Sequence, residues 1–231
     1  MILKRYLATV VLTLLVMPLI AQPNTDWAKF GRYEQANREI QTPVRAIFMG
    51  DSITDHWYKY DPGFFDLNGF LGRGISGQTT SEMLVRFRRD VIDLHPAVVL
   101  IMAGTNDIAQ NNGFIKPENT LGNIISMCQL AHANGIEVIL CSIPPVSRFA
   151  WRPEIDPAQK VLELNDMIRR YAIDNGIYYL DYYPHLADAD GGIPEKWSHD
   201  TCHPNAECYR TVMEPLAAEA INTVLNDKYN N

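Results

Sequence analysis

The sequence predicts a single α/β domain in which a parallel sheet lies between two layers of helices. Apolar, β-branched runs alternate with helical patterns along the chain, which is the order of a doubly wound domain. The apolar runs are continuous, as is typical of strands that are covered on both faces and therefore parallel. A chain of 231 residues, 47% hydrophobic and 20% charged, suits one such domain better than two.

Five strands and four long helices are expected. The strands are predicted at 44–49, near 70–75, and at 97–102, 137–142 and 177–181. The helices are predicted at 79–93, 118–133, 157–174 and 205–228, and the irregular stretches at 57–69, 143–156 and 182–203.

Local signals mark several helix ends. Thr79-x-x-Glu82 resembles a capping box at the start of the first helix. Asn134-Gly135 should end the second helix, because glycine is a common helix stop. Pro204 fits the first turn of the last helix. Pro215 lies inside that helix and should kink or split it.

The first 21 residues are interpreted as a secretory signal peptide, which leaves 22–231 as the domain. Lys4 and Arg5 precede an apolar run, and Ala21 offers a small residue for cleavage. The run has about 14 residues, whereas a membrane-spanning helix needs about 20, so no membrane anchor is expected after cleavage. The net charge of −7 and the lack of a basic face argue against nucleic-acid binding.

The four cysteines do not suggest a metal site. Cys128, Cys141, Cys202 and Cys208 lack the C-x-x-C spacing of a thiolate zinc site. An exported protein forms disulfides readily, and Cys202 and Cys208 are close in sequence, but four cysteines permit three pairings and the sequence does not choose among them. Neither a metal nor a cofactor is expected.

Four loops fall where ligands bind in such folds, outside the carboxyl ends of the strands. They are Gly50-Asp51-Ser52, the glycine-rich stretch 72–77, the stretch 104–107, and 199–203 near the end of the chain. Ser52 offers a hydroxyl nucleophile, and His203 offers a base that can be neutral near pH 7. Asp200, three residues earlier, is placed to orient the imidazole and to stabilise its protonated form.

Acyl transfer also needs hydrogen-bond donors for a tetrahedral oxyanion. Three candidates lie at the same edge, namely the backbone N–H groups of Ser52 and Gly77 and the side-chain amide of Asn106. Each motif alone has a purely structural interpretation as a turn, a helix cap or a surface pair. Their combination at one sheet edge, in complementary chemical roles, favours catalysis.

Other enzyme classes fit less well. Thr54 stands where G-x-S-x-G would need its second glycine, and no H-E-x-x-H motif occurs. The glycines of 72–77 have the spacing of a dinucleotide fingerprint. The acidic residue expected to bind the ribose would be Asp93, which lies at a helix end and not at a strand end, so NAD binding is not favoured.

Taken together, the blocks G-D-S-I (50–53), G-I-S-G-Q-T-T (74–80), G-T-N-D (104–107) and D-x-x-H (200–203) resemble those of the SGNH hydrolases, the GDSL esterase/lipase superfamily. Ile53 replaces the usual leucine. The resemblance implies a flavodoxin-like sheet and an esterase with Ser52 as nucleophile, His203 as base and Asp200 as its partner. It also assigns Ser52, Gly77 and Asn106 to the oxyanion hole. Exported acylhydrolases similar to platelet-activating-factor acetylhydrolase subunits and carbohydrate acetylesterases resemble the chain most.

The substrate is less well defined by the sequence. Residues that could line the mouth of the site are Asp51, Tyr58, Tyr60, Phe64, Phe65, Arg148, Phe149, Trp151 and Trp197, although each aromatic could equally be local packing. No broad apolar lid is evident, so short acyl esters are favoured, with acetyl groups on carbohydrate as the first choice. A lysophospholipase or thioesterase of the same fold and a catalytically inert carbohydrate-binding protein are the alternatives.

Overall fold

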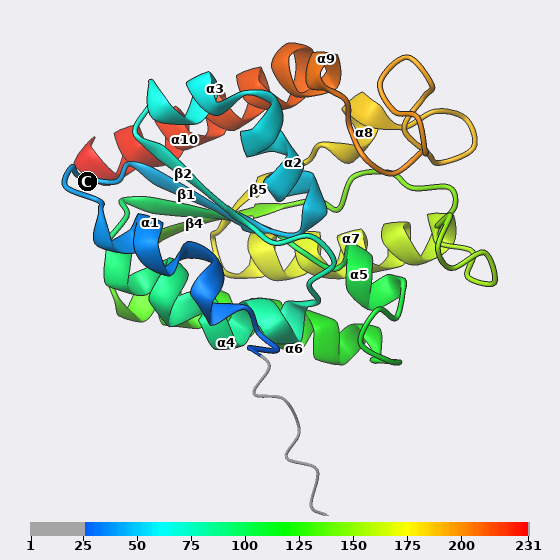
Figure 1. Ribbon diagram of the computed structural model, residues 1–231, viewed down its shortest axis with the longest axis horizontal. Helices are drawn as coiled ribbons and strands as arrows, with labels where there is room; N and C mark the ends of the chain where they lie inside the picture. Colours follow the sequence, from blue (N-terminus) through cyan, green and yellow to red (C-terminus); the bar gives the residue numbers. More distant parts are fainter. Residues whose placement is uncertain (1–25, 231) are drawn as a thin grey trace, which may run out of the picture.

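The computed structural model describes residues 26–230, and its centre is one five-stranded parallel sheet (Figure 1). Its strands are β1 (Ala46–Gly50), β2 (Phe70–Gly74), β3 (Val98–Met102), β4 (Glu137–Cys141) and β5 (Tyr178–Leu180). Their order is β2-β1-β3-β4-β5, and every neighbouring pair is parallel. This is the flavodoxin-like order, so the predicted fold class is confirmed.

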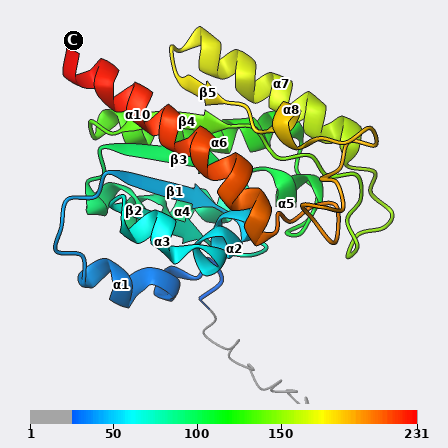
Figure 2. The ribbon, with the colours of Figure 1, turned by 90° about the horizontal axis from the view of Figure 1, so that it is seen from above.

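Helices cover both faces of the sheet (Figure 2). One face carries α4 (Thr80–Asp90), α6 (Pro117–Ala133) and α7 (Ala158–Asp174), and the other carries α2 (Ser52–Tyr60), α3 (Pro62–Asp66) and α10 (Glu214–Asn230). Side chains of β1 alternate between the two layers, with Ile47 and Met49 in one core cluster and Phe48 in the other. The sheet is therefore buried on both faces, which explains its continuous apolar strands.

Most of the predicted helix signals are present, but the prediction for Pro204 was wrong. The helical segment begins at Ala206 with Asn205 as its cap, so Pro204 precedes the first turn. The backbone N–H of Thr79 donates to the Glu82 carboxylate at 2.8 Å, as a capping box requires. Helix α6 ends before Gly135, which has the left-handed φ of +71° that favours glycine. Pro215 lies at the second position of α10, after a short helix α9 (Ala206–Cys208) and a π-helical segment (Tyr209–Met213). The three segments are contiguous, so the helix is not split; its hydrogen-bond pattern changes to π-helical just before the proline, which cannot donate a backbone hydrogen bond.

The prediction that 57–69 is irregular was wrong, because most of it is helical. Helix α2 continues to Tyr60, and α3 follows after a single residue, Asp61. The side chain of Asp61 accepts from the N–H of Phe64, and Pro62 occupies the first turn. The proline of this segment thus begins a helix.

Several shorter elements were also not predicted. They are the 3-10 segments Phe30–Tyr33 and Ile92–Leu94 and the helices α1 (Glu34–Arg38), α5 (Thr105–Ile108) and α8 (Tyr183–Leu186). Each has five residues or fewer, so none has a hydrophobic period long enough to recognise. The asparagine side chain of α1, Asn37, donates to Asp90 of α4 at 2.9 Å and so ties α1 to the domain.

Within residues 26–230, no helix is long and apolar enough to cross a bilayer. The signal peptide predicted for residues 1–21 lies outside the described part of the chain. All four cysteines are buried free thiols, so Cys202 and Cys208 are not joined by a disulfide.

Candidate active site

The nucleophile candidate lies at the junction of β1 and α2. Ser52 is the first residue of α2, and the Asp51 side chain caps that helix by accepting from the N–H of Ile53 at 3.0 Å. The turn packs tightly against the end of β2, where a Cβ on Gly74 would lie only 2.3 Å from the backbone nitrogen of Asp55. Glycine is therefore required at Gly74 so that α2 can begin directly above the sheet.

Ser52, His203 and Asp200 form one hydrogen-bonded series. Ser52 Oγ lies 2.9 Å from His203 Nε2, although the two residues are 151 positions apart in the chain. On the other side of the ring, His203 Nδ1 lies 2.6 Å from Asp200 Oδ2. The geometry lets an imidazole accept the serine proton while a carboxylate holds its tautomer.

The Asp200 carboxylate is held by the turn that carries it. Its Oδ1 accepts from the N–H groups of Cys202 at 3.0 Å and His203 at 2.8 Å, and from the Ser198 hydroxyl at 3.1 Å. Thr201 adopts a left-handed φ of +64°, which lets the backbone fold around the carboxylate. Burial alone would raise the pKa of Asp200, but the hydrogen bonds from His203 and Cys202 outweigh it and hold that pKa well below its usual range.

Two histidine rings lie close together here, and their pKa values are shifted in opposite directions. Burial alone would lower the pKa of His203, but the hydrogen bond and the charge of Asp200 raise it above its ordinary value. The ring of His56, one turn along α2 from Ser52, lies 5.2 Å from the His203 ring. Burial and the neighbouring charges of His203 and Lys59 lower the pKa of His56. His56 was not predicted, because the sequence analysis recognised no helix after Ser52 that would place His56 on the same face.

Two of the predicted oxyanion donors are backbone N–H groups. Within the described part of the chain, neither the backbone N–H of Ser52 nor that of Gly77 donates to another protein group. Gly77 is exposed with a φ of +84°, and a Cβ placed on it would have open space around it. Both N–H groups are therefore available to a ligand, and a developing negative charge needs such donors.

Asn106 lies between these two backbone segments. It is buried, and its Nδ2 donates to the carbonyl of Gln78 at 3.1 Å and to Asp51 Oδ2 at 3.3 Å. Asp51 is 2% exposed, so it supports Asn106 and α2 from below and does not face a substrate. Burial raises the pKa of Asp51 to about 6.

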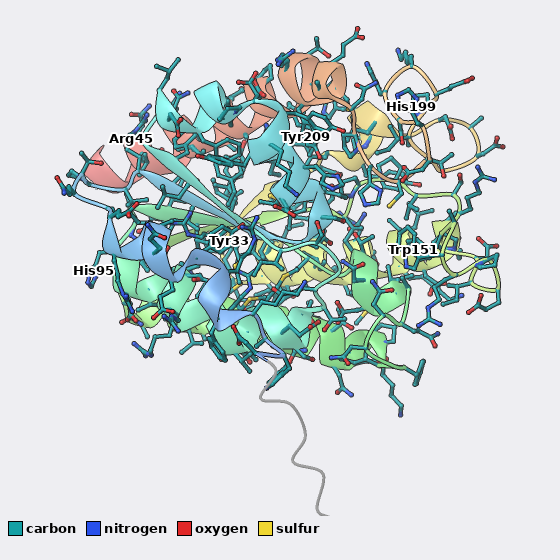
Figure 3. All side chains as sticks on the ribbon, in the orientation of Figure 1. Tyr33, Arg45, His95, Trp151, His199 and Tyr209 are labelled. Carbon is teal, nitrogen blue, oxygen red and sulfur yellow. The ribbon has the colours of Figure 1, made fainter. Side chains whose placement is uncertain are left out.

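The structure brings together only some of the other predicted substrate-binding residues. The ring of Trp151 lies 6.1 Å from that of His203. Figure 3 shows Trp151 at the right of the view, where the long loops gather. Tyr58 lies six residues along α2, where its ring packs against Phe65 at 5.3 Å and its Cβ covers Gly72. Tyr58 is therefore directed toward β2 and away from Ser52, because α2 runs back from the active edge.

The remaining candidates are placed as follows. Arg148 is exposed. Trp197 is partly buried against the core cluster on the α10 face, with Lys196 Nζ 3.9 Å from its ring centroid. Phe65 is completely buried and Phe64 packs in the same cluster, so both are core residues. Phe149 is buried beside Trp151 at 5.0 Å, where it supports that ring.

Sequence reasoning also missed Asn111. This side chain accepts from Trp151 Nε1 at 2.9 Å and donates to Asn106 Oδ1 at 2.6 Å. It follows the G-T-N-D block by four residues, in a loop with no recognised motif, so no pattern in the sequence marked it.

The fold and this hydrogen-bonded series define the class of the protein as an α/β acylhydrolase. The model of the GDSL-like Lipase/Acylhydrolase family matches residues 48–211, and the chain belongs to this family. The matched region extends from the strand before Ser52 to beyond His203, so it contains all four sequence blocks.

Known proteins agree with this assignment. A candidate acylhydrolase from Bacteroides fragilis has 45% sequence identity and a TM-score of 0.84, over 87% of this chain and 99% of that chain. An acetylxylan esterase from Geobacillus stearothermophilus, at 18% identity, shares the fold with a TM-score of 0.62 over 79% of this chain and 95% of that chain. The uncharacterized lipoprotein YqeF of Bacillus subtilis is 28% identical over 140 residues, which are 53% of this chain and 58% of that protein.

Proposed function

We propose that the protein is an exported serine esterase that hydrolyses short acyl esters, with acetyl esters of carbohydrates as its favoured substrates. The observation that carries this proposal is the series from Ser52 Oγ through the His203 ring to Asp200, with contacts of 2.9 and 2.6 Å. This series ends at a serine whose own N–H has no protein partner within residues 26–230.

Acylation follows from this geometry. Ser52 Oγ attacks the ester carbonyl carbon while His203 Nε2 removes the hydroxyl proton, and Asp200 stabilises the imidazolium that forms. The carbonyl oxygen becomes an oxyanion that accepts from the N–H groups of Ser52 and Gly77 and from Asn106 Nδ2, which gives up its longer bond, the one of 3.3 Å to Asp51. When the intermediate collapses, the alcohol leaves with the proton from His203, and the acyl group stays on Ser52.

Deacylation repeats these steps with water. His203 Nε2 takes a proton from a water molecule, which attacks the acyl carbon of the ester on Ser52. The second tetrahedral intermediate uses the same oxyanion donors. Its collapse returns the proton to Ser52 Oγ and releases the carboxylic acid.

The interior under the site favours a short acyl group. The cavity beneath the start of α2, lined by Thr54, Trp57 and Met102 among others, has a volume of only about 10 Å³. The groups around Ser52 are polar, since Asp51, Thr105 and Asn106 are all buried there. Among the described residues, the core beneath α2 thus has no room for a long acyl chain, whereas an acetyl group needs no tunnel.

Two observations support a carbohydrate as the alcohol part of the ester. Trp151 is 42% exposed beside His203, and exposed aromatic rings stack well on the C–H faces of sugars. The acetylxylan esterase described above has the same fold. For the location, the signal-peptide pattern of residues 1–21 and the relative named as a lipoprotein both support export.

The nucleophile is tested with Ser52→Ala and 4-nitrophenyl acetate. We expect kcat/KM to fall by at least about 10³-fold with the thermal unfolding midpoint retained. Ser126→Ala is the matched control, because the Ser126 hydroxyl only bonds the Gly122 carbonyl within α6. Near-normal turnover by Ser52→Ala would refute the serine mechanism.

The acyl preference is tested with acetyl, octanoyl and palmitoyl esters of one alcohol. Activity should be highest with acetyl and decline with length. A preference that rises with chain length would instead identify a lysophospholipase or thioesterase.

A further inference from the structure

Asn111 bridges an exposed side chain and a buried one. Its Oδ1 accepts from the indole N–H of Trp151 at 2.9 Å, and its Nδ2 donates to Asn106 Oδ1 at 2.6 Å. Asn106 Nδ2 in turn donates to the Gln78 carbonyl at 3.1 Å. We propose that Asn111 is a positioning residue that couples substrate contact at Trp151 to oxyanion stabilisation by Asn106. This inference rests on the proposed function.

The direction of each hydrogen bond from Trp151 through Asn111 and Asn106 to Gln78 is determined by the two groups at the ends of this series. The Trp151 indole nitrogen can only donate, so Asn111 must present its oxygen to Trp151 and its NH₂ to Asn106. The Gln78 carbonyl can only accept, so Asn106 must present its NH₂ to Gln78 and its oxygen to Asn111. Both amides are therefore held in one orientation, with Asn106 Nδ2 on the Gln78 and Asp51 side.

That orientation is the one that catalysis needs. If the Asn106 amide turned over, its oxygen would face Gln78 and Asp51, and an oxyanion would meet an acceptor in place of a donor. Asn111 Nδ2 also lies 3.5 Å from the carbonyl oxygen of Gly77. Asn111 thus contacts both Asn106 and the residue that carries the second predicted oxyanion donor.

The loop that presents Asn111 is itself well held. The backbone N–H of Asn111 donates to the carbonyl of Asn106 at 3.0 Å, and Gln110 before it has a left-handed φ of +55°. Arg152 Nη2 reaches the Gln110 carbonyl at 3.3 Å. The loop 143–156 is therefore tied to the loop after β3 at two adjacent points, through Arg152 and through Trp151.

Trp151 provides the substrate end of this chain. Its ring packs on Phe149 at 5.0 Å, faces the His203 ring at 6.1 Å with an interplanar angle of 35°, and remains 42% exposed. The C–H face of a substrate sugar, such as a pyranose, would stack on the exposed part and so lie beside the reacting atoms. The predicted substrate class is accordingly an ester whose alcohol part contains a sugar ring close to the acyl group.

The first experiment is a double-mutant cycle on Asn111 and Asn106, with Asn112→Ala as the control from the same loop. Asn112 is exposed, and we expect its alanine variant to keep normal kinetics. Asn111→Ala should lower kcat for acetyl esters about tenfold, because Asn106 Oδ1 loses its hydrogen bond from Asn111 and the amide is then held only through its Nδ2, by Gln78 and Asp51. In an Asn106→Ala background the same change should cost less than about twofold, since there is no amide left to orient.

A conservative variant sharpens the test. Asn111→Asp still accepts from Trp151, but it presents a carboxylate oxygen to Asn106 Oδ1 and so favours the wrong orientation of the Asn106 amide. We expect its kcat to fall further than that of Asn111→Ala, by about 10²-fold, approaching the loss in Asn106→Ala. If the Asn111→Ala and Asn106→Ala effects on kcat are independent, or Asn111→Ala keeps normal kcat, the coupling is refuted.

The substrate end is tested with Trp151→Phe and Trp151→Ala on ethyl acetate and on a monoacetylated methyl xyloside. Trp151→Ala should raise KM for the xyloside about tenfold and leave KM for ethyl acetate nearly unchanged. Trp151→Phe keeps the ring but loses the N–H, so it should keep the xyloside KM and lower kcat severalfold. Unchanged xyloside KM in Trp151→Ala would overturn the stacking role, and unchanged kcat in Trp151→Phe would overturn the link to Asn111.

These failures are distinct from a failure of the proposed function. An active Ser52→Ala enzyme would remove the serine mechanism itself. An inactive Ser52→Ala enzyme together with independent effects at Asn111 and Asn106 would leave the mechanism in place and remove only the positioning role.

Discussion

The two halves of the site are built in different ways. Ser52, Gly77 and Asn106 lie where regular elements meet, after β1, before α4 and in α5 after β3. Asp200 and His203 lie in the segment 187–205, where no strand or helix is present. The half that holds the proposed nucleophile, here called the nucleophile half, is positioned by the sheet. The half that holds the proposed base, here called the base half, has to be positioned by its own hydrogen bonds.

The nucleophile half rests on a buried polar frame. Arg86 is completely buried, forms an ion pair with Asp90 at 3.0 Å and donates to the Gly50 carbonyl at 3.1 Å. Its Nε also donates to the Gln78 side chain at 2.5 Å. One guanidinium therefore joins the end of β1 to the loop that carries Gly77, which is the kind of satisfied buried network that rigidifies a core.

The base half uses carboxylates that accept from nearby backbone N–H groups. Asp188 accepts from the N–H groups of Asp190 and Gly192, both at 2.9 Å, and Asp200 accepts in the same manner from Cys202 and His203. A loop can thus hold a side chain in place when carboxylates accept from its backbone N–H groups. We therefore expect polar substitutions in the base half to change the positions of the Asp200 and His203 side chains directly. Three variants test this difference between the two halves.

The largest effect is expected from Asp200→Asn. The asparagine oxygen can still accept from the backbone, but its NH₂ faces His203 Nδ1 and forces the tautomer in which Nε2 carries the proton. That tautomer cannot accept from Ser52, so kcat/KM should fall by about 10³–10⁴-fold. Asp188→Asn is the matched control, since it keeps its acceptor oxygen and has no histidine partner. A loss of less than about tenfold in Asp200→Asn would remove Asp200 from the mechanism.

The same variant changes the pH profile. His203 must be neutral to act as a base, and Asp200 raises its pKa, so activity should decline as the pH falls through a value above 6.5, the ordinary pKa of histidine. In Asp200→Asn, which lacks the carboxylate, the acidic limb of the pH profile of kcat/KM should move to lower pH. A limb that stays in place would show that another group controls it.

On the nucleophile half, Asn106→Ala should lower kcat by about 10²–10³-fold, the usual cost of one oxyanion donor. The matched control is Asn165→Ala, another buried asparagine, whose side chain bonds the N–H of Ile143 at 2.7 Å and the carbonyl of Ile143 at 2.9 Å. Asn165→Ala should lower the free energy of unfolding by about 1–3 kcal/mol and leave the kcat of folded enzyme unchanged. If both variants lose only stability, Asn106 has a structural role alone.

The smallest effect is expected from Thr201→Gly in the base half. Thr201 has a φ of +64°, and its hydroxyl is buried without a hydrogen-bond partner in the described part of the chain. Glycine removes both penalties. It also gives the unfolded chain more entropy, which offsets part of this gain, so the free energy of unfolding should rise by about 1 kcal/mol. Activity should persist, because the bonds to Asp200 come from the N–H groups of Cys202 and His203. Thr201→Ala should gain less, and a lower unfolding midpoint in Thr201→Gly would contradict the strain argument.

The site residues that could be predicted from the sequence are those with a local chemical signature. The series Ser52, His203 and Asp200 was expected from short blocks, and the structure brings these side chains within hydrogen-bond distance. Their catalytic roles remain predictions for the variants above. Asp51 shows the limit of this approach, since proximity to Ser52 suggested a substrate contact and the side chain is in fact buried.

Tyr58 and Trp151 show the same limit for aromatic residues. Both follow a strand of the predicted active edge and both are 42% exposed. Only Trp151 lies beside His203, because the chain after β1 turns back as a helix whereas the chain after β4 stays at the edge as a loop. His56 and Asn111 became visible as site residues only through what they contact.

The sequence by itself determined the parallel sheet, the helix caps and the edge at which chemistry is expected, because these depend on runs of neighbouring residues. Continuous apolar strands, the capping box at Thr79 and the glycine at Gly135 all act over a few positions. Only the tertiary structure decided which polar groups meet across that edge. Hydrogen bonds such as those from Trp151 to Asn111 and from Asn111 to Asn106 depend on angles and distances between separate loops, which no local pattern encodes.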